Sequence, residues 1–169
     1  MPQPIPPRYC PSRELPRERS APGAPRRGSW HGRELPGELL PPARWRESEA
    51  WLFGVDLWNA GFAWEAYEVW EVLWNKARST SPLQAKFLQG LVMVAASVVH
   101  VRRGNMETAH SLRESGPALL MAVRTEAGPV FMGLDLDGFI AGVEENLGGG
   151  NGEIIPLLEL QDWPINQAG

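Results

Sequence analysis

The chain has 169 residues, a formal net charge of −4 and a single cysteine. One cysteine excludes an internal disulfide, and the lack of an apolar run of about 18 residues argues against a membrane-spanning helix. We therefore expect a cytoplasmic protein with no membrane attachment. The acidic body also argues against nucleic acid as a partner.

Charge and proline are distributed unevenly, and this divides the chain into an arm and a body. Residues 1–47 hold nine arginines against five glutamates, and eleven of the sixteen prolines. The rest of the chain holds seven basic residues against fifteen acidic ones. The start is too poor in apolar residues to bury a core of its own. We expect residues 1–41 to form a Pro/Arg-rich arm, disordered or loosely packed, and residues 42–169 to form a single helical domain.

Three helices are expected in the first part of the body, where apolar residues recur at helical spacing. The first spans residues 42–60, and the second spans residues 62–77 after a glycine. The third begins at a capping box, with Ser81 as N-cap and the Gln84 side chain reaching back, and continues to Arg103.

Two further helices are expected in the second part of the body. Asn105 can cap a helix that runs to about Val123, with a disturbance at residues 116–117. A shorter helix is expected over residues 134–147, and the apolar end at residues 154–158 should pack back on the body. No stretch has the pattern of a strand ladder. The sequence therefore predicts an all-α fold, a compact bundle of about five mostly antiparallel helices.

The tryptophans and the carboxylates are concentrated in the same part of the chain. Six of the eight tryptophans lie between Trp45 and Trp74, and we interpret them as core residues. Residues 47–75 hold six carboxylates and no Lys, Arg or His. On the second helix, Glu65, Glu68 and Glu71 lie opposite the apolar arc. Apolar residues interrupt that side, so we expect it to be partly covered. Carboxylates in such surroundings need a cation, a hydrogen-bond donor, a metal or a proton.

The third helix offers polar partners for this side. If the second and third helices form a hairpin, Gln89 comes level with Val69, near Glu68, and His100 reaches beyond the start of the second helix, near Asn59. The candidate polar cluster from these residues comprises Asn59, Glu65, Glu68, Gln89 and His100.

Two roles are open for this cluster. The first is a structural or ligand- or partner-binding role in a non-catalytic domain. The alternative is a metal-assisted or acid–base enzyme that acts on a small molecule, with Glu65, Glu68 and His100 as possible ligands of a divalent metal. No Glu-x-x-His motif and no nearby Ser or Cys nucleophile accompanies these residues, so we favour the first role and predict no cofactor. The Trp-rich body also suggests a homodimer or an unknown protein partner.

Several short motifs together resemble a known family, domain of unknown function family 309, an uncharacterised bacterial family with a small all-α bundle. The motifs are Trp58-Asn59-Ala60-Gly61, Trp64-Glu65-Ala66-Tyr67-Glu68-Val69-Trp70-Glu71-x-x-Trp74, Phe87-Leu88-Gln89-Gly90-Leu91 and His100-x-x-x-Gly104-Asn105. The resemblance covers roughly residues 53–135 and implies the fold but no established activity. By position it adds Glu71 and Trp74 to the candidate site. Where the family pattern has a histidine, this chain has Tyr67, which supplies a phenol in place of an imidazole.

Overall fold

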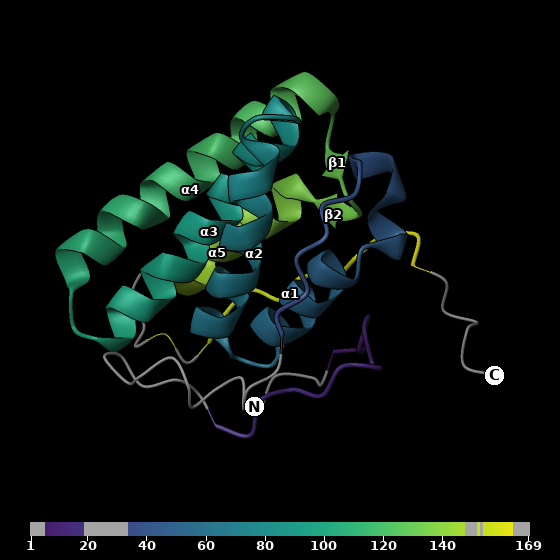
Figure 1. Cartoon of the computed structure of the whole chain (residues 1–169). Helices are drawn as coiled ribbons and strands as arrows, with labels where there is room; N and C mark the ends of the chain where they lie inside the picture. The colour runs from purple at the N-terminus through teal and green to yellow at the C-terminus, as the bar shows by residue number, and fades with distance from the viewer. Residues whose placement is uncertain (1–5, 19–33, 148–151, 153, 164–169) are drawn as a thin grey trace.

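The computed structural model of the protein describes residues 6–18, 34–147, 152 and 154–163. Most of this chain is helical, and the predicted all-α fold is confirmed (Figure 1). The elements, in chain order, are the 3-10 helix η1 (Pro42–Glu47), α1 (Glu49–Asn59), α2 (Ala63–Ala77), α3 (Pro82–Arg102), α4 (Met106–Ala127), the short strands β1 (Val130–Phe131) and β2 (Leu134–Asp135), and α5 (Leu136–Leu147).

Helix α3 forms the centre of the bundle. It packs against α2 on one side and α4 on the other, while α1 packs against α2 and α5 against α4 (Figure 1). Among the described helices, α3 is the one long and apolar enough to cross a membrane by length and composition, yet 67% of its most apolar window is buried inside the bundle. Burial between two neighbouring helices explains an apolar helix of this kind, and it is consistent with the core helix of a soluble protein.

Three tryptophans occupy the core between α1 and α2. Trp51, Trp58 and Trp70 are fully or almost fully buried. The Trp70 ring lies 6.1 Å from that of Trp51 and 6.2 Å from that of Trp58, between ring centroids. The interpretation as core residues is confirmed for these three and for Trp45, whereas Trp64 and Trp74 are only half-buried. Large buried rings supply apolar area that holds α1 on α2.

The single first helix predicted over residues 42–60 is wrong, because the chain breaks at Ser48. There the backbone is extended, with φ −80° and ψ 100°, and the Ser48 side chain accepts a hydrogen bond from the Trp51 N–H. Serine satisfies one of the unpaired amides of a new helix in this way. The segment therefore forms η1 and α1 rather than one continuous helix.

The predicted capping box at the start of α3 is also wrong, although the helix begins where it was expected. The Ser81 side chain makes no capping hydrogen bond. The Gln84 amide is buried and donates to the Leu40 carbonyl at 2.9 Å, so it ties the segment before η1 to α3. Likewise, the Asn105 side chain makes no capping hydrogen bond at the start of α4.

Helix α4 runs without interruption through Pro117 to Ala127, further than predicted. The preceding residue, Gly116, allows α3 and α4 to approach closely. A Cβ atom on Gly116 would lie 2.9 Å from the Gly90 carbonyl oxygen, and one on Gly90 would lie 2.8 Å from a methyl carbon of Leu120. Two glycines thus meet where these helices cross.

A two-stranded antiparallel hairpin, which the sequence did not predict, precedes α5. Val130 pairs with Asp135 and Phe131 with Leu134, and Met132 and Gly133 turn the chain with positive φ values of 48° and 80°. The hairpin uses the first two residues of the predicted fifth helix, so α5 begins at Leu136.

Part of the N-terminal arm is packed more closely than its composition indicated. Residues 6–18 run across α1, and Tyr9 and Cys10 are only 5% and 6% exposed (Figure 1). Residues 1–5 and 19–33 of the arm lie outside the described residues, and the boundary at residue 42 remains a prediction. At the other end of the chain, Ile155 and Leu158 are buried, which confirms that the apolar end packs back on the body.

Candidate functional site

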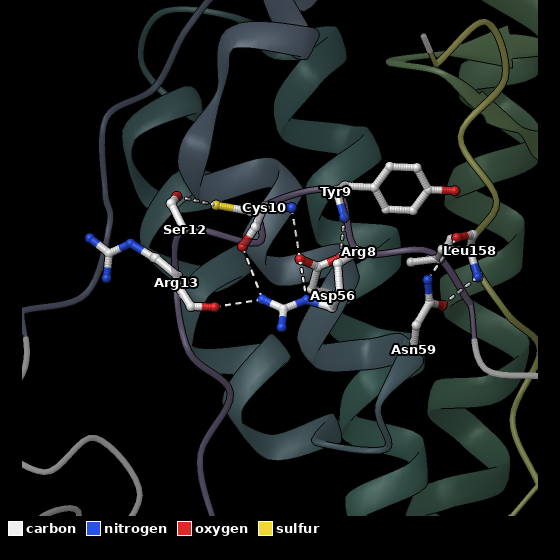
Figure 2. A network of polar contacts seen from close by, with 8 residues as sticks. All are labelled: Arg8, Tyr9, Cys10, Ser12, Arg13, Asp56, Asn59 and Leu158. Atoms are coloured by element: carbon white, nitrogen blue, oxygen red, sulfur yellow. Dashed lines mark hydrogen bonds and ion pairs between the residues drawn. The ribbon is translucent and has the colours of Figure 1, made fainter. Parts of the chain in front are cut away.

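Asp56 of helix α1 holds the N-terminal segment, residues 6–18, as Figure 2 shows. The Asp56 side chain is buried, and its Oδ1 accepts a hydrogen bond from the Tyr9 N–H at 2.8 Å. Its Oδ2 accepts from the Cys10 N–H and from Arg8 Nε, each at 2.8 Å. A buried carboxylate is stable only when its lone pairs are satisfied, and here the N-terminal segment supplies three donors. Asp56 therefore anchors this segment.

The end of α1 holds the C-terminal segment, residues 154–163, in a similar way. The Asn59 amide donates to the Leu158 carbonyl at 2.9 Å, and its oxygen accepts from the Leu158 N–H at 2.7 Å (Figure 2). One residue earlier, the Trp58 indole donates to the Pro156 carbonyl at 2.7 Å. Asn59, which was predicted as part of the polar cluster, thus pairs with backbone from the other end of the chain.

A cleft of about 1100 Å³ opens between the two terminal segments and the start of α1. Tyr9 and Trp163 lie in its wall, where their rings meet edge to face at 5.2 Å. Burial raises the pKa of the Tyr9 phenol and of the Cys10 thiol. The thiol therefore remains protonated at neutral pH and is a poor nucleophile. On the rim, the carboxylate of Glu49 is paired with Arg13.

Most of the other predicted site residues lie on a surface formed by α2 and α3, which we call the α2–α3 face. All of its members are half-buried. It comprises Trp64, Tyr67, Glu68, Glu71 and Trp74 of α2 and Gln89, Met93 and His100 of α3. Along each of the two adjacent helices these residues recur at separations of three, four or seven residues, so each set lines one side of its helix.

Aromatic rings and arginines are already in contact on this face. The Trp64 and Tyr67 rings stack at 5.3 Å, with 13° between their planes. The Arg103 guanidinium lies 5.8 Å from the centroid of the Trp64 ring, and that of Arg78 lies 5.2 Å from Trp74. Cation–π contacts at exposed sites contribute about 0.5–1 kcal/mol each, so they favour these ring orientations. Tyr67, which replaces the family histidine, is thus a packing partner of Trp64.

The geometry does not support the predicted metal ligands. Among the residues that the structure describes, no group of three or more His, Cys, Asp or Glu side chains is placed to hold a metal ion, and Glu65, Glu68 and His100 form no such group. Glu65 is only 1% exposed in the first turn of α2. His100 lies near the end of α3, with its Nδ1 3.4 Å from the Asn105 amide.

Sequence reasoning missed the partners of two charged residues. Asp56 is one of the six carboxylates of residues 47–75, but its partner Arg8 is 48 residues away and no local pattern connects them. Arg102 donates to the Gly61 carbonyl at 3.1 Å and to the Gly152 carbonyl at 2.9 Å, which ties the α1–α2 turn to the C-terminal segment. The residues around Arg102 in the sequence give no indication of these acceptors.

The comparison with known families agrees with the motifs. Residues 51–112 match the model of a family described as a domain of unknown function, DUF309. The match contains nearly all of α1, all of α2 and α3, and the start of α4, and therefore the whole α2–α3 face. No curated protein and no solved structure shows significant similarity to the chain. Over residues 51–112, the chain is thus similar to the DUF309 family, in agreement with the resemblance that its motifs carry.

Proposed function

We propose that this protein is a non-catalytic helical domain that binds a protein partner through the α2–α3 face. The observation that carries the proposal is the row of half-exposed aromatic side chains held by arginines, Trp64 by Arg103 and Trp74 by Arg78. Tryptophan, tyrosine and arginine are the residues most enriched at the energetic centres of protein interfaces. Rings that are already held in place lose little conformational entropy on binding.

The hydrogen bonds of the polar residues of α1 support the same proposal. Asp56 and Asn59 are buried, and their oxygens accept hydrogen bonds from the backbone of the terminal segments. Groups bound in this way contribute to the fold. The half-exposed side chains of α2 and α3 remain as the polar and aromatic surface that a partner can reach.

A second candidate is an acid–base or metal-assisted enzyme, and the burial of Glu65 is the observation in its favour. A buried carboxylate is a common feature of catalytic sites, as well as of structural networks. Elemental analysis of the purified, unchelated protein and of its Glu68→Ala variant distinguishes this candidate. A near-stoichiometric metal that is lost in the variant would support the enzyme and contradict the non-catalytic proposal.

Oxidative footprinting tests the binding proposal directly. The protein is labelled with hydroxyl radicals once in purified form at low concentration and once in the cells that produce it. We expect Trp74 and Met93 to be oxidised several-fold more slowly in cells, because a partner covers them. Met106 and Met121 on α4 are 53% and 44% exposed and serve as controls within the same chain.

Two results would contradict the proposal. One is equal oxidation of Trp74 and Met93 in both samples. The other is an equal loss of labelling at Met106 and Met121, which would report the cellular medium rather than contact at the α2–α3 face.

A further inference from the structure

We propose that the partner of the α2–α3 face is a second copy of this chain, and that two α2 helices pack antiparallel about a two-fold axis at the level of Trp74. This inference rests on the proposed function, and it names the partner that the face would bind. It follows from the order of residues along the outer side of α2.

The outer side of α2 carries residues at the spacing of a coiled-coil seam. Successive members are separated by three, four, three and four residues, as the a and d positions of heptads are. We call this row the α2 seam. It comprises Trp64, Tyr67, Glu71, Trp74 and Arg78. Its first four members are half-buried and Arg78 is exposed, so the seam lies at the surface of the described bundle. A seam of this spacing suits contact with another helix at a shallow crossing angle.

The charges of the α2 seam select an antiparallel copy of α2 as that helix. Glu71 precedes Trp74 by three residues and Arg78 follows it by four. The two charged residues are therefore seven residues apart, or about 10 Å along the helix. A two-fold axis near Trp74 therefore places Glu71 of one copy opposite Arg78 of the other, and the same pair forms again on the far side of the axis. Within the described part of the chain, neither residue forms an ion pair.

The same axis places an aromatic residue at the middle of the contact. Trp74 of one copy meets Trp74 of the other, and each ring already has the Arg78 guanidinium 5.2 Å from its centroid. The result is an aromatic centre with a charged pair on each side, the arrangement typical of a compact interface. A two-fold contact is also self-complementary, so one surface serves both partners.

Sedimentation velocity of the full chain over a wide range of concentration tests this inference. We expect a concentration-dependent dimer. Glu71→Arg and Arg78→Glu should each raise the dimer dissociation constant about 100-fold or more, because each variant brings like charges together on both sides of the axis. An equimolar mixture of the two variants should dimerise again, since each chain then supplies the charge that the other lacks.

Control variants and a second readout keep the outcomes apart. Glu144→Arg on the exposed side of α5 changes the charge equally and should leave the dimer intact. Thermal unfolding verifies that each variant is folded. A monomer at every concentration, or a mixture that stays monomeric when the wild type dimerises, overturns the two-fold pairing. Suppose that the two-fold pairing is overturned. If Trp74 and Met93 are still oxidised more slowly in cells than in the purified protein, the proposed binding function stands with another protein as partner. If their oxidation is equal in the two samples, the pairing and the binding function both fail.

Discussion

At the scale of single residues, a glycine of α1 lies directly against a tryptophan of α2. A Cβ atom on Gly54 would lie 2.2 Å from the Trp70 indole nitrogen, so the ring packs directly on the helix backbone. That nitrogen is buried and has no hydrogen-bond partner in the described chain. A side chain at this position would displace the Trp70 ring from between Trp51 and Trp58.

We therefore expect Gly54→Ala to lower the free energy of unfolding by about 1–2 kcal/mol, since the close approach puts the cost of overpacking in its upper range. Overpacking of a core typically costs about 1–3 kcal/mol, and the better helix propensity of alanine returns about 1 kcal/mol of it. Denaturant unfolding followed by tryptophan fluorescence measures the change. Gly138→Ala in α5 is the matched control, because its Cβ would meet only the flexible carboxylate of Asp135. A Gly54→Ala protein as stable as the wild type would contradict this packing.

At the scale of elements, the N-terminal segment is packed on α1 and hydrogen-bonded to it. Its buried thiol offers a direct reporter, because Cys10 is the single cysteine of the chain. We expect Cys10 to react slowly with a thiol reagent in the native protein. Asp56→Asn should speed this reaction at least tenfold, because the variant loses the charge that pairs with Arg8 and an acceptor for backbone N–H groups.

The control for this experiment is Glu49→Gln, which removes the exposed ion pair with Arg13 near the same segment. Exposed pairs contribute little, so labelling should barely change. If Asp56→Asn labels at the wild-type rate while the protein remains folded, the carboxylate does not hold the segment.

The elements also show where sequence reasoning succeeds. Local periodicity and terminal glycines placed α2 and α3 to within a residue or two, because helix formation and helix ends depend on neighbouring residues. The prediction failed at Ser48, where a local serine cap starts a new helix, and at the Ser81–Gln84 capping box, where a tertiary partner, the Leu40 carbonyl, accepts from the Gln84 amide. The short hairpin before α5 has two-residue strands, too short for any alternation to appear.

The candidate site also combines features that neighbouring residues determine with contacts between distant parts of the chain. The predicted site residues Glu68, Glu71, Gln89 and His100 are half-buried on two adjacent helices, whereas Glu65, which was predicted on the same partly covered side, is fully buried. It could not reveal that Asn59 pairs with Leu158, 99 residues further along the chain. Contacts at such separations depend on the path of the whole chain.

At the scale of the whole molecule, both ends of the described chain converge on α1 (Figures 1 and 2). Asp56 binds the N-terminal segment, and Asn59 and Trp58 bind the C-terminal one. The two segments also meet each other, since the Tyr9 hydroxyl accepts a hydrogen bond from the Leu160 N–H at 3.0 Å. Asp56 and Asn59 of α1 thus serve the fold, while the half-buried residues of the α2–α3 face lie at the surface that we propose for binding.

Amide hydrogen exchange of the full-length protein tests this division most directly. The account predicts that the backbone amides of Tyr9, Cys10, Leu158 and Leu160 exchange as slowly as those in the middle of α3, because buried side chains hold them. Exchange of these four amides at the rate of an unfolded chain would contradict the account. In that case Asp56 and Asn59 would be released from the terminal segments and available for another role.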